Sequence, residues 1–185
     1  MRPIERSEIV DYQTYQDTRA ETRPSVLAAK ESRRILVGEY LTLLFENRAT
    51  VRYQVQEMMR TEKIVRETEI QHEIDTYNEL LHDGGALGCT LMIGIDDPAE
   101  RDVKLRAWMG LVDHLYATLP DGTKVRPTFD KRQVGEERLS SVQYLTYPIG
   151  AAAPVALGVD HPKISVEATL TDEQRAALQA DLDAE

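Results

Sequence analysis

Two Glu-x-x-His pairs lie between residues 69 and 82, and they are the side chains best suited to chemistry. Glu69 pairs with His72, Glu79 pairs with His82, and Asp75 lies between the two pairs. A carboxylate and an imidazole three residues apart lie on one side of a helix, as in di-iron carboxylate proteins. Such oxygen and nitrogen ligands suit iron, manganese or zinc. The spacing predicts a metal site made by these five residues, provided that other elements enclose them.

The same five side chains also fit a solvent-exposed surface. Ile70, Ile74, Tyr77 and Leu81 form an apolar stripe on the opposite side of the predicted helix. A helix with one apolar face usually shows its polar face to water. Ferritin-like sites also draw their Glu-x-x-His pairs from two helices, whereas both pairs here share one. The sequence therefore leaves open a metal site and a polar ridge that faces solvent or a partner.

A second polar cluster surrounds the start of the preceding helix, for which Asn47 is the predicted N-cap. The first turn of a helix carries unpaired N–H groups and partial positive charge, so adjacent arginines indicate a site for phosphate or a carboxylate. The alternative is a set of capping contacts and ion pairs. We expect a later charged loop to contribute as well, so that the predicted anion-binding residues are Arg48, Arg52, Gln56, Arg132 and Arg138.

Helices are predicted before, between and after the strands. The segment 1–32 reads as helical, with Pro24 at the start of its second piece and Val26 and Leu27 packed inward. Thr68, followed by Gln71, is a predicted capping box for the helix that carries the metal ligands. A further capping box starts the C-terminal helix. Strands are expected near 35–37, 87–95, 111–119, 123–129, 142–149 and 163–170.

These elements predict an α+β fold, because the strands are joined mainly by hairpins and do not alternate regularly with helices. We expect a mostly antiparallel sheet with helices packed on one face, N-terminal helices and a C-terminal helix. Small residues on one face of the strand at 87–95 would let a helix approach closely. A length of 185 residues favours a single domain over 1–185. Its parts are a helical segment 1–32, a core 33–149, an Ala-, Gly- and Pro-rich loop 150–160, and a strand and helix 161–185.

Composition narrows the classes of function. The net charge of −10 argues against nucleic acid and anionic membranes as partners, since both require a positive surface. A single cysteine, Cys89, excludes an intramolecular disulfide framework and a four-cysteine metal site. The first residues contain no apolar signal region, and no apolar run approaches ~20 residues. We therefore expect a cytoplasmic protein.

Four segments, LLFENRATVRYQVQEMMR, HEIDTYNELL, IDDPAER and FDKRQVGEERLSSVQYL, resemble an uncharacterised bacterial domain-of-unknown-function family. The resemblance runs from about residue 33 to residue 147. The family has no assigned activity, so it transfers no catalytic residue. Its members tend to be encoded beside rubrerythrin-type proteins and iron–sulfur oxidoreductase subunits. By association, this implies a role in a redox or oxidative-stress module.

Three functions follow as hypotheses. The first is a cofactor-free accessory protein that binds a protein partner, either rubrerythrin-type or an iron–sulfur oxidoreductase. The second is an iron-, manganese- or zinc-binding protein or enzyme that uses the Glu/His/Asp ridge. The third is a small-anion binding module centred on Arg48 and Arg52. A homo-oligomer is compatible with each hypothesis.

Overall fold

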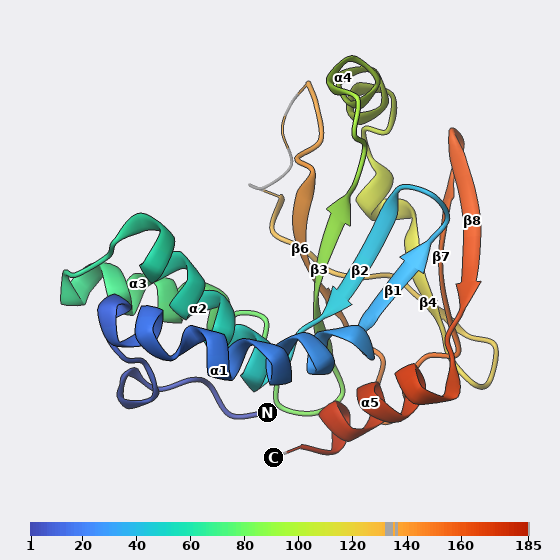
Figure 1. The fold of residues 1–185 in the computed structure, drawn as a ribbon. Helices are drawn as coiled ribbons and strands as arrows, with labels where there is room; N and C mark the ends of the chain where they lie inside the picture. The colour runs from blue at the N-terminus through green and yellow to red at the C-terminus, as the bar shows by residue number, and fades with distance from the viewer. Residues whose placement is uncertain (132–134, 136, 185) are drawn as a thin grey trace.

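The computed structural model describes residues 1–131, 135 and 137–184, in which the strands form two four-stranded antiparallel sheets (Figure 1). The first sheet has the order β1-β2-β3-β6, with β1 Arg34–Val37, β2 Leu41–Phe45, β3 Leu87–Ile93 and β6 Val142–Tyr147. The second has the order β5-β4-β7-β8, with β4 Leu115–Thr118, β5 Lys124–Val125, β7 Ala156–His161 and β8 Ile164–Thr169. The α+β class is confirmed, with the strands divided between two sheets.

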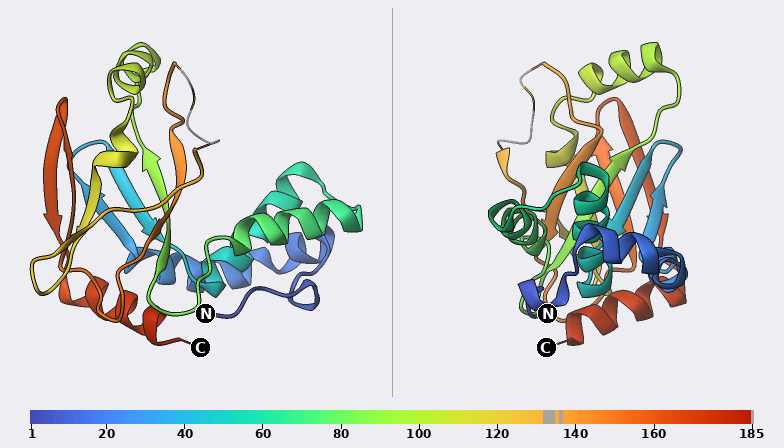
Figure 2. Two further views of the ribbon diagram at one scale, coloured as in Figure 1. Left: turned by 180° about the vertical axis from the view of Figure 1, so that it is seen from behind. Right: turned by 60° about the vertical axis from the view of Figure 1, so that its left-hand side comes forward.

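The helices lie around these sheets. They are α1 Tyr12–Glu31, α2 Arg48–Glu62, α3 Glu67–Asn78, α4 Pro98–Ala107 and α5 Asp172–Asp183, with short 3₁₀ helices η1 Arg6–Glu8 and η2 Leu111–His114. Figures 1 and 2 show α4 and α5 at opposite ends of the paired sheets, while α1, α2 and α3 extend to one side as a helical lobe. None of the helices in the described ranges has the length and apolarity needed to cross a membrane.

Two hydrophobic clusters hold these parts together. In the first, alternating residues of β3 such as Leu87 and Leu91 share a core with Leu157 and Val159 of β7, so one face of each sheet is buried. The second cluster lies within the helical lobe. There the predicted apolar stripe of α3 packs against apolar residues of α2 and of the N-terminal segment. The buried members of this cluster include Met1, Ile4, Ile9, Val51, Val55, Met59, Ile70, Ile74 and Tyr77.

The helical lobe meets the first sheet at Gly88 of β3. A Cβ atom at this position would overlap the backbone of Leu80, including its carbonyl oxygen, just beyond α3. Only glycine permits so close an approach of two backbones. The predicted small-residue face of this strand is therefore where the helical lobe is held against the sheet.

Two helix predictions are wrong. Pro24 lies inside α1 and not at a helix start, and Leu27 is 37% exposed instead of packed inward. Pro24 is exposed, so its missing N–H deprives only a solvent-accessible carbonyl of a partner. The N-cap of α3 is Arg66 rather than Thr68, and it makes no side-chain capping bond. Packing of the apolar stripe decides where this helix begins.

The segment 150–160 is not a loop throughout, because residues 156–161 belong to β7. β7 pairs along its length with β8 and also with β4. Hydrogen bonds on both sides outweigh the weak strand preference of Ala and Gly. Glycine at position 158 leaves room for the ring of Tyr116, which a Cβ atom there would overlap. The small residues of this segment therefore allow close packing around β7, which lies between two other strands.

Candidate functional site

The predicted metal ligands are not brought together. Glu69, His72, Asp75 and Glu79 are exposed, and α3 ends at Asn78, so the second Glu-x-x-His pair lies beyond the helix. The half-buried His82 places its Nε2 atom 3.0 Å from the hydroxyl of Thr146. Within the described ranges, no three His, Cys, Asp or Glu side chains are close enough to hold a metal ion.

Two of the predicted anion-binding residues hold the N-terminal segment in place. The guanidinium of Arg48 donates to both carboxylate oxygens of Glu8, at 2.8 and 2.6 Å, and to two backbone carbonyls of residues 2 and 3. The amide of Gln56 accepts from the N–H of Val10 at 2.9 Å and donates to its carbonyl at 3.0 Å. Both side chains are therefore already occupied by this chain.

Of the other predicted anion-binding residues, Arg52 lies beside Arg48 and Gln56, and Arg138 does not. Arg138 pairs with Asp102 of α4 at 3.0 Å, at the end of the sheets remote from α2. Arg132 lies outside the described residues. Arg52 is exposed on α2 and lines a hollow of about 240 Å³ against α1. Arg52 also shares a small hollow with Arg48, so three members of the set are neighbours on α2 and only Arg138, among the described members, lies apart.

A larger space lies between the helical lobe and the outer face of the first sheet. This helix–sheet cleft has a volume of about 450 Å³. Its floor is a cross-strand row in which Arg34 lies opposite Leu44, Leu44 opposite Thr90, and Thr90 opposite Tyr144. Residues directly opposite one another project from the same face of a sheet. Register therefore brings one residue from each of four strands into a single surface.

Glu46 supplies a buried carboxylate to the cleft. It directly follows β2, and its backbone N–H donates to the carbonyl of Gly88 at 2.9 Å. The side chain is only 6% exposed. Its Oε1 accepts a hydrogen bond from the hydroxyl of Thr90 at 2.8 Å, while its buried Oε2 has no partner among the described residues. Burial of a carboxylate oxygen without a hydrogen-bond donor lowers the stability of the folded protein. A donor supplied from the cleft would remove this cost.

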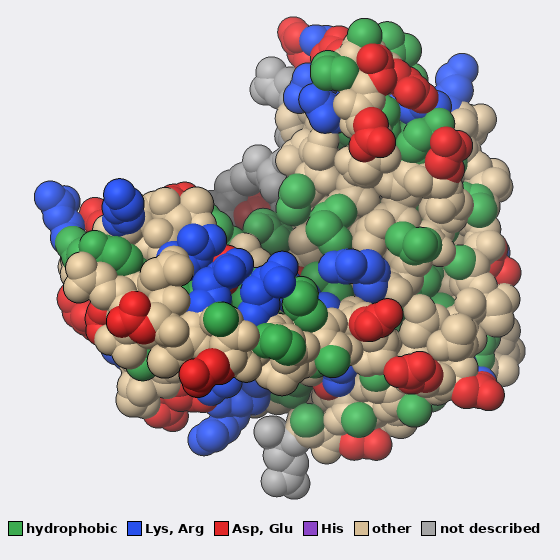
Figure 3. All heavy atoms as spheres, viewed as in Figure 1, with side chains coloured by type: hydrophobic (Ala, Val, Ile, Leu, Met, Phe, Trp, Pro, Cys, Tyr) green, Lys and Arg blue, Asp and Glu red, His purple; other side chains and the backbone are tan. Residues whose placement is uncertain are grey.

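Two cationic side chains line the same cleft. Lys30 is half-buried near the end of α1, with its Nζ 4.9 Å from the centre of the Tyr53 ring. Burial lowers the pKa of Lys30, the carboxylate of Glu46 raises it, and the nearby Arg34 lowers it. Neither Lys30 nor Arg34 forms an ion pair with any described residue. Figure 3 shows Lys and Arg side chains gathered where the helices meet the sheet.

The remainder of the cleft is largely apolar. The rings of Tyr77 and Tyr144 meet edge to face, with centroids 6.2 Å apart, and burial raises the pKa of Tyr144, which keeps it a neutral phenol. Val142 is 42% exposed and Tyr144 is 37% exposed. An adjoining hollow of about 360 Å³ shares Tyr77, Leu80 and Tyr144 with the cleft. Apolar surface is therefore available beside the charged groups.

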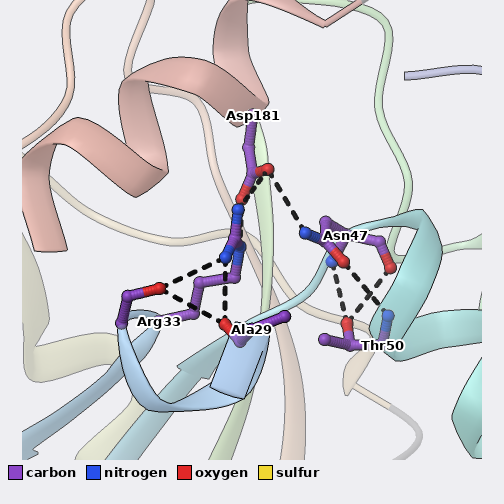
Figure 4. A network of polar contacts seen from close by, with 6 residues as sticks. Ala29, Arg33, Asn47, Thr50 and Asp181 are labelled. Atoms are coloured by element: carbon purple, nitrogen blue, oxygen red, sulfur yellow. Dashed lines mark hydrogen bonds and ion pairs between the residues drawn. The ribbon is translucent and has the colours of Figure 1, made fainter. Parts of the chain in front are cut away.

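A buried polar network fixes the neighbours of the charged residues (Figure 4). The guanidinium of Arg33 pairs with both carboxylate oxygens of Asp181 on α5, at 2.6 and 2.9 Å, and donates to the carbonyl of Ala29 at 2.9 Å. Asn47, which caps α2, donates to Asp181 at 3.4 Å. Because Arg33 precedes Arg34 and Asn47 follows Glu46, the network anchors both sides of the cleft.

Sequence patterns alone do not reveal this site. Lys30, Arg34 and Glu46 come from a helix, a strand and a loop, and no short motif links them. The one available signal is the acidic residue directly after the apolar run Leu41–Phe45, where a charge is unexpected next to a buried strand. The register that aligns Arg34 with Leu44 becomes visible only in the folded chain.

Comparison with known proteins shows where the chain belongs. A crystal structure of a novel protein of unknown function from Burkholderia pseudomallei K96243 matches with a TM-score of 0.90 and 31% sequence identity, over 98% of this chain and 100% of that chain. No curated protein matches the present chain. Residues 3–182 match the family model described as Protein of unknown function (DUF3501), a range that includes every residue of the helix–sheet cleft named above. The chain therefore belongs to the DUF3501 family.

Proposed function

We propose that the protein binds a small anionic ligand in the helix–sheet cleft. The observation that carries the proposal is the presence of two cations, Lys30 and Arg34, that line a cleft and have no described ion-pair partner. The protein as a whole carries a net charge of −10. A local excess of positive charge in an acidic protein attracts an anion, and a guanidinium binds a carboxylate through two parallel hydrogen bonds.

The size and lining of the cleft favour a small organic anion. A volume of about 450 Å³ falls within the range of about 300–1,000 Å³ that is typical of ligand pockets. Exposed apolar side chains such as Val142 and Tyr144 lie beside the cations. A ligand with one anionic end and one apolar end would cover both surfaces. This is the anion-binding function inferred from the sequence, at a different site from Arg48 and Arg52.

Ligand binding also suits the accessory role that the family resemblance implies. A protein that holds a small molecule can serve a larger redox module without a cofactor of its own. Within the proposal, ligand binding is the primary event and any contact with a protein partner is secondary.

Isothermal titration calorimetry with 3-phenylpropionate at low ionic strength tests the proposal. We expect saturable one-site binding that weakens by about tenfold or more in Lys30→Met and in Arg34→Met, because each removes a charge-assisted hydrogen bond. The matched control is Arg52→Met, which removes an exposed cation outside the cleft. Absence of binding, or weaker binding in Arg52→Met alone, would overturn the proposal.

A further inference from the structure

The buried carboxylate of Glu46 carries the argument further and identifies a class of ligand. Resting on the proposed function, we infer that the helix–sheet cleft binds an α-amino acid with an apolar side chain. The ammonium group of the ligand donates to Glu46, its carboxylate is held by Arg34 and Lys30, and its side chain lies against the apolar floor.

The carboxylate of Glu46 can accept a hydrogen bond from a donor group of the ligand. Of its two oxygens, Oε1 is paired with Thr90, and the buried Oε2 is without a described partner. Lys30 interacts electrostatically with Glu46 but forms no ion pair with it. An ammonium group has three donors and a positive charge, so its hydrogen bond to a carboxylate is stronger than that of a neutral group. A ligand that carried only an anion would leave Oε2 unpaired.

The sheet register sets the distance between Arg34 and Glu46, the two residues that would bind the charged groups of the ligand. Arg34 lies directly opposite Leu44, and Glu46 is two residues beyond Leu44 along the chain. Diagonal neighbours of this kind have Cα atoms about 7–8 Å apart. An α-amino acid carries its ammonium and carboxylate groups on a single carbon, so both groups fit between these two side chains. Lys30 reaches the same cleft from α1 and adds a second cation for the carboxylate.

The floor beside the charged groups selects the ligand's side chain. In the next cross-strand row, Met92 of β3 lies opposite Val142 of β6, and both line the cleft with Leu44 and Tyr144. Val142 and Tyr144 are substantially exposed. An apolar side chain would remove this surface from water, whereas a charged or hydroxyl-bearing one would not. Leucine and phenylalanine are therefore preferred to aspartate and serine.

Calorimetry with a matched pair of ligands tests the inference. L-phenylalanine and 3-phenylpropionate share a ring and a carboxylate and differ in the ammonium group. We expect the wild-type protein to bind L-phenylalanine about tenfold or more tightly, the effect of one charge-assisted hydrogen bond. Glu46→Gln should abolish this preference while keeping 3-phenylpropionate affinity, and the control Glu39→Gln, an exposed residue outside the cleft, should preserve it.

The outcomes separate this inference from the proposed function. Equal binding of the two ligands by the wild-type protein, a comparison that needs no variant, would overturn the inference and leave anion binding in place. If Glu46→Gln still binds L-phenylalanine more tightly than 3-phenylpropionate, the inference is likewise overturned and anion binding stays in place. If neither ligand binds, both the inference and the proposed function fall.

Discussion

Glu57 on α2 holds α1 against α2 within the helical lobe, and Glu57→Gln should destabilise the protein in a pH-dependent way. Its Oε1 accepts from the hydroxyl of Tyr15 and from Nε of Arg19, both at 2.6 Å, and its Oε2 accepts from Arg60 at 3.2 Å. Burial raises the pKa of Glu57, but the hydrogen bonds from Arg19, Tyr15 and Arg60 outweigh that effect and lower the pKa to about 2.

The magnitude follows from this pKa. A fall from 4.5 to about 2 corresponds to roughly 3 kcal/mol of stability at pH 7, at about 1.4 kcal/mol per unit. Because the folded-state pKa lies below the unfolded-state value, the contribution is complete above about pH 4.5 and is lost as pH falls toward 2. Glu57 and Arg19 keep 16% and 28% of their side chains exposed, so solvent screening reduces the expected value to about 2 kcal/mol.

Urea denaturation of the wild-type protein and Glu57→Gln at pH 7 and pH 3 measures this effect. The difference in unfolding free energy should be about 2 kcal/mol at pH 7 and less than half of that at pH 3. The control is Glu31→Gln, an exposed carboxylate at the end of α1, which should change stability little at either pH. A difference for Glu57→Gln that is equal at both pH values would refute the reasoning.

Three further substitutions probe the contacts that hold the cleft in place, each by urea denaturation at pH 7. Asp181→Ala removes the carboxylate partner of the largely buried Arg33 guanidinium, which keeps only its hydrogen bonds to neutral groups such as the Ala29 carbonyl, so it should cost about 3 kcal/mol; a loss below 1 kcal/mol would contradict the described network. Gly88→Ala forces a methyl group against Leu80 and should cost about 1–3 kcal/mol or more, whereas Gly94→Ala has open space and is the control. Asn47→Ala removes the cap of α2 and should cost about 1 kcal/mol; an unchanged midpoint would show that the cap is dispensable.

The sequence predicts the parts of the fold that depend on local chemistry. Asn47 caps α2 as expected, because its side-chain oxygen accepts from the backbone N–H of Thr50, three residues away. Thr171 and Gln174 form the predicted capping box of α5. The predicted apolar stripe of α3 is buried, since side chains spaced three and four residues apart lie on one face of a helix. These features are settled by residues close together in the chain.

The parts that depend on distant residues are not predicted. β7 forms in an Ala- and Gly-rich segment because β4 and β8 pair with it on both sides. Glu46 has no distinctive neighbours in the sequence, and its role depends on Thr90, more than 40 residues away. The Glu-x-x-His pairs show the reverse case. Their spacing matches a metal motif, but the fold leaves Glu69 and His72 exposed.

The pairing of Arg33 with Asp181 also has a consequence for the order of events during biosynthesis. The two residues are 148 positions apart, and at about 5–20 residues per second a ribosome needs roughly 7–30 s to travel that distance. Until α5 emerges, Arg33 lacks its carboxylate and Asn47 lacks its partner on that helix. The nascent helical lobe can therefore form its own hydrophobic cluster early. The polar contacts of Arg33 and Asn47 with α5, at the junction with the sheets, form only after the last helix is synthesised.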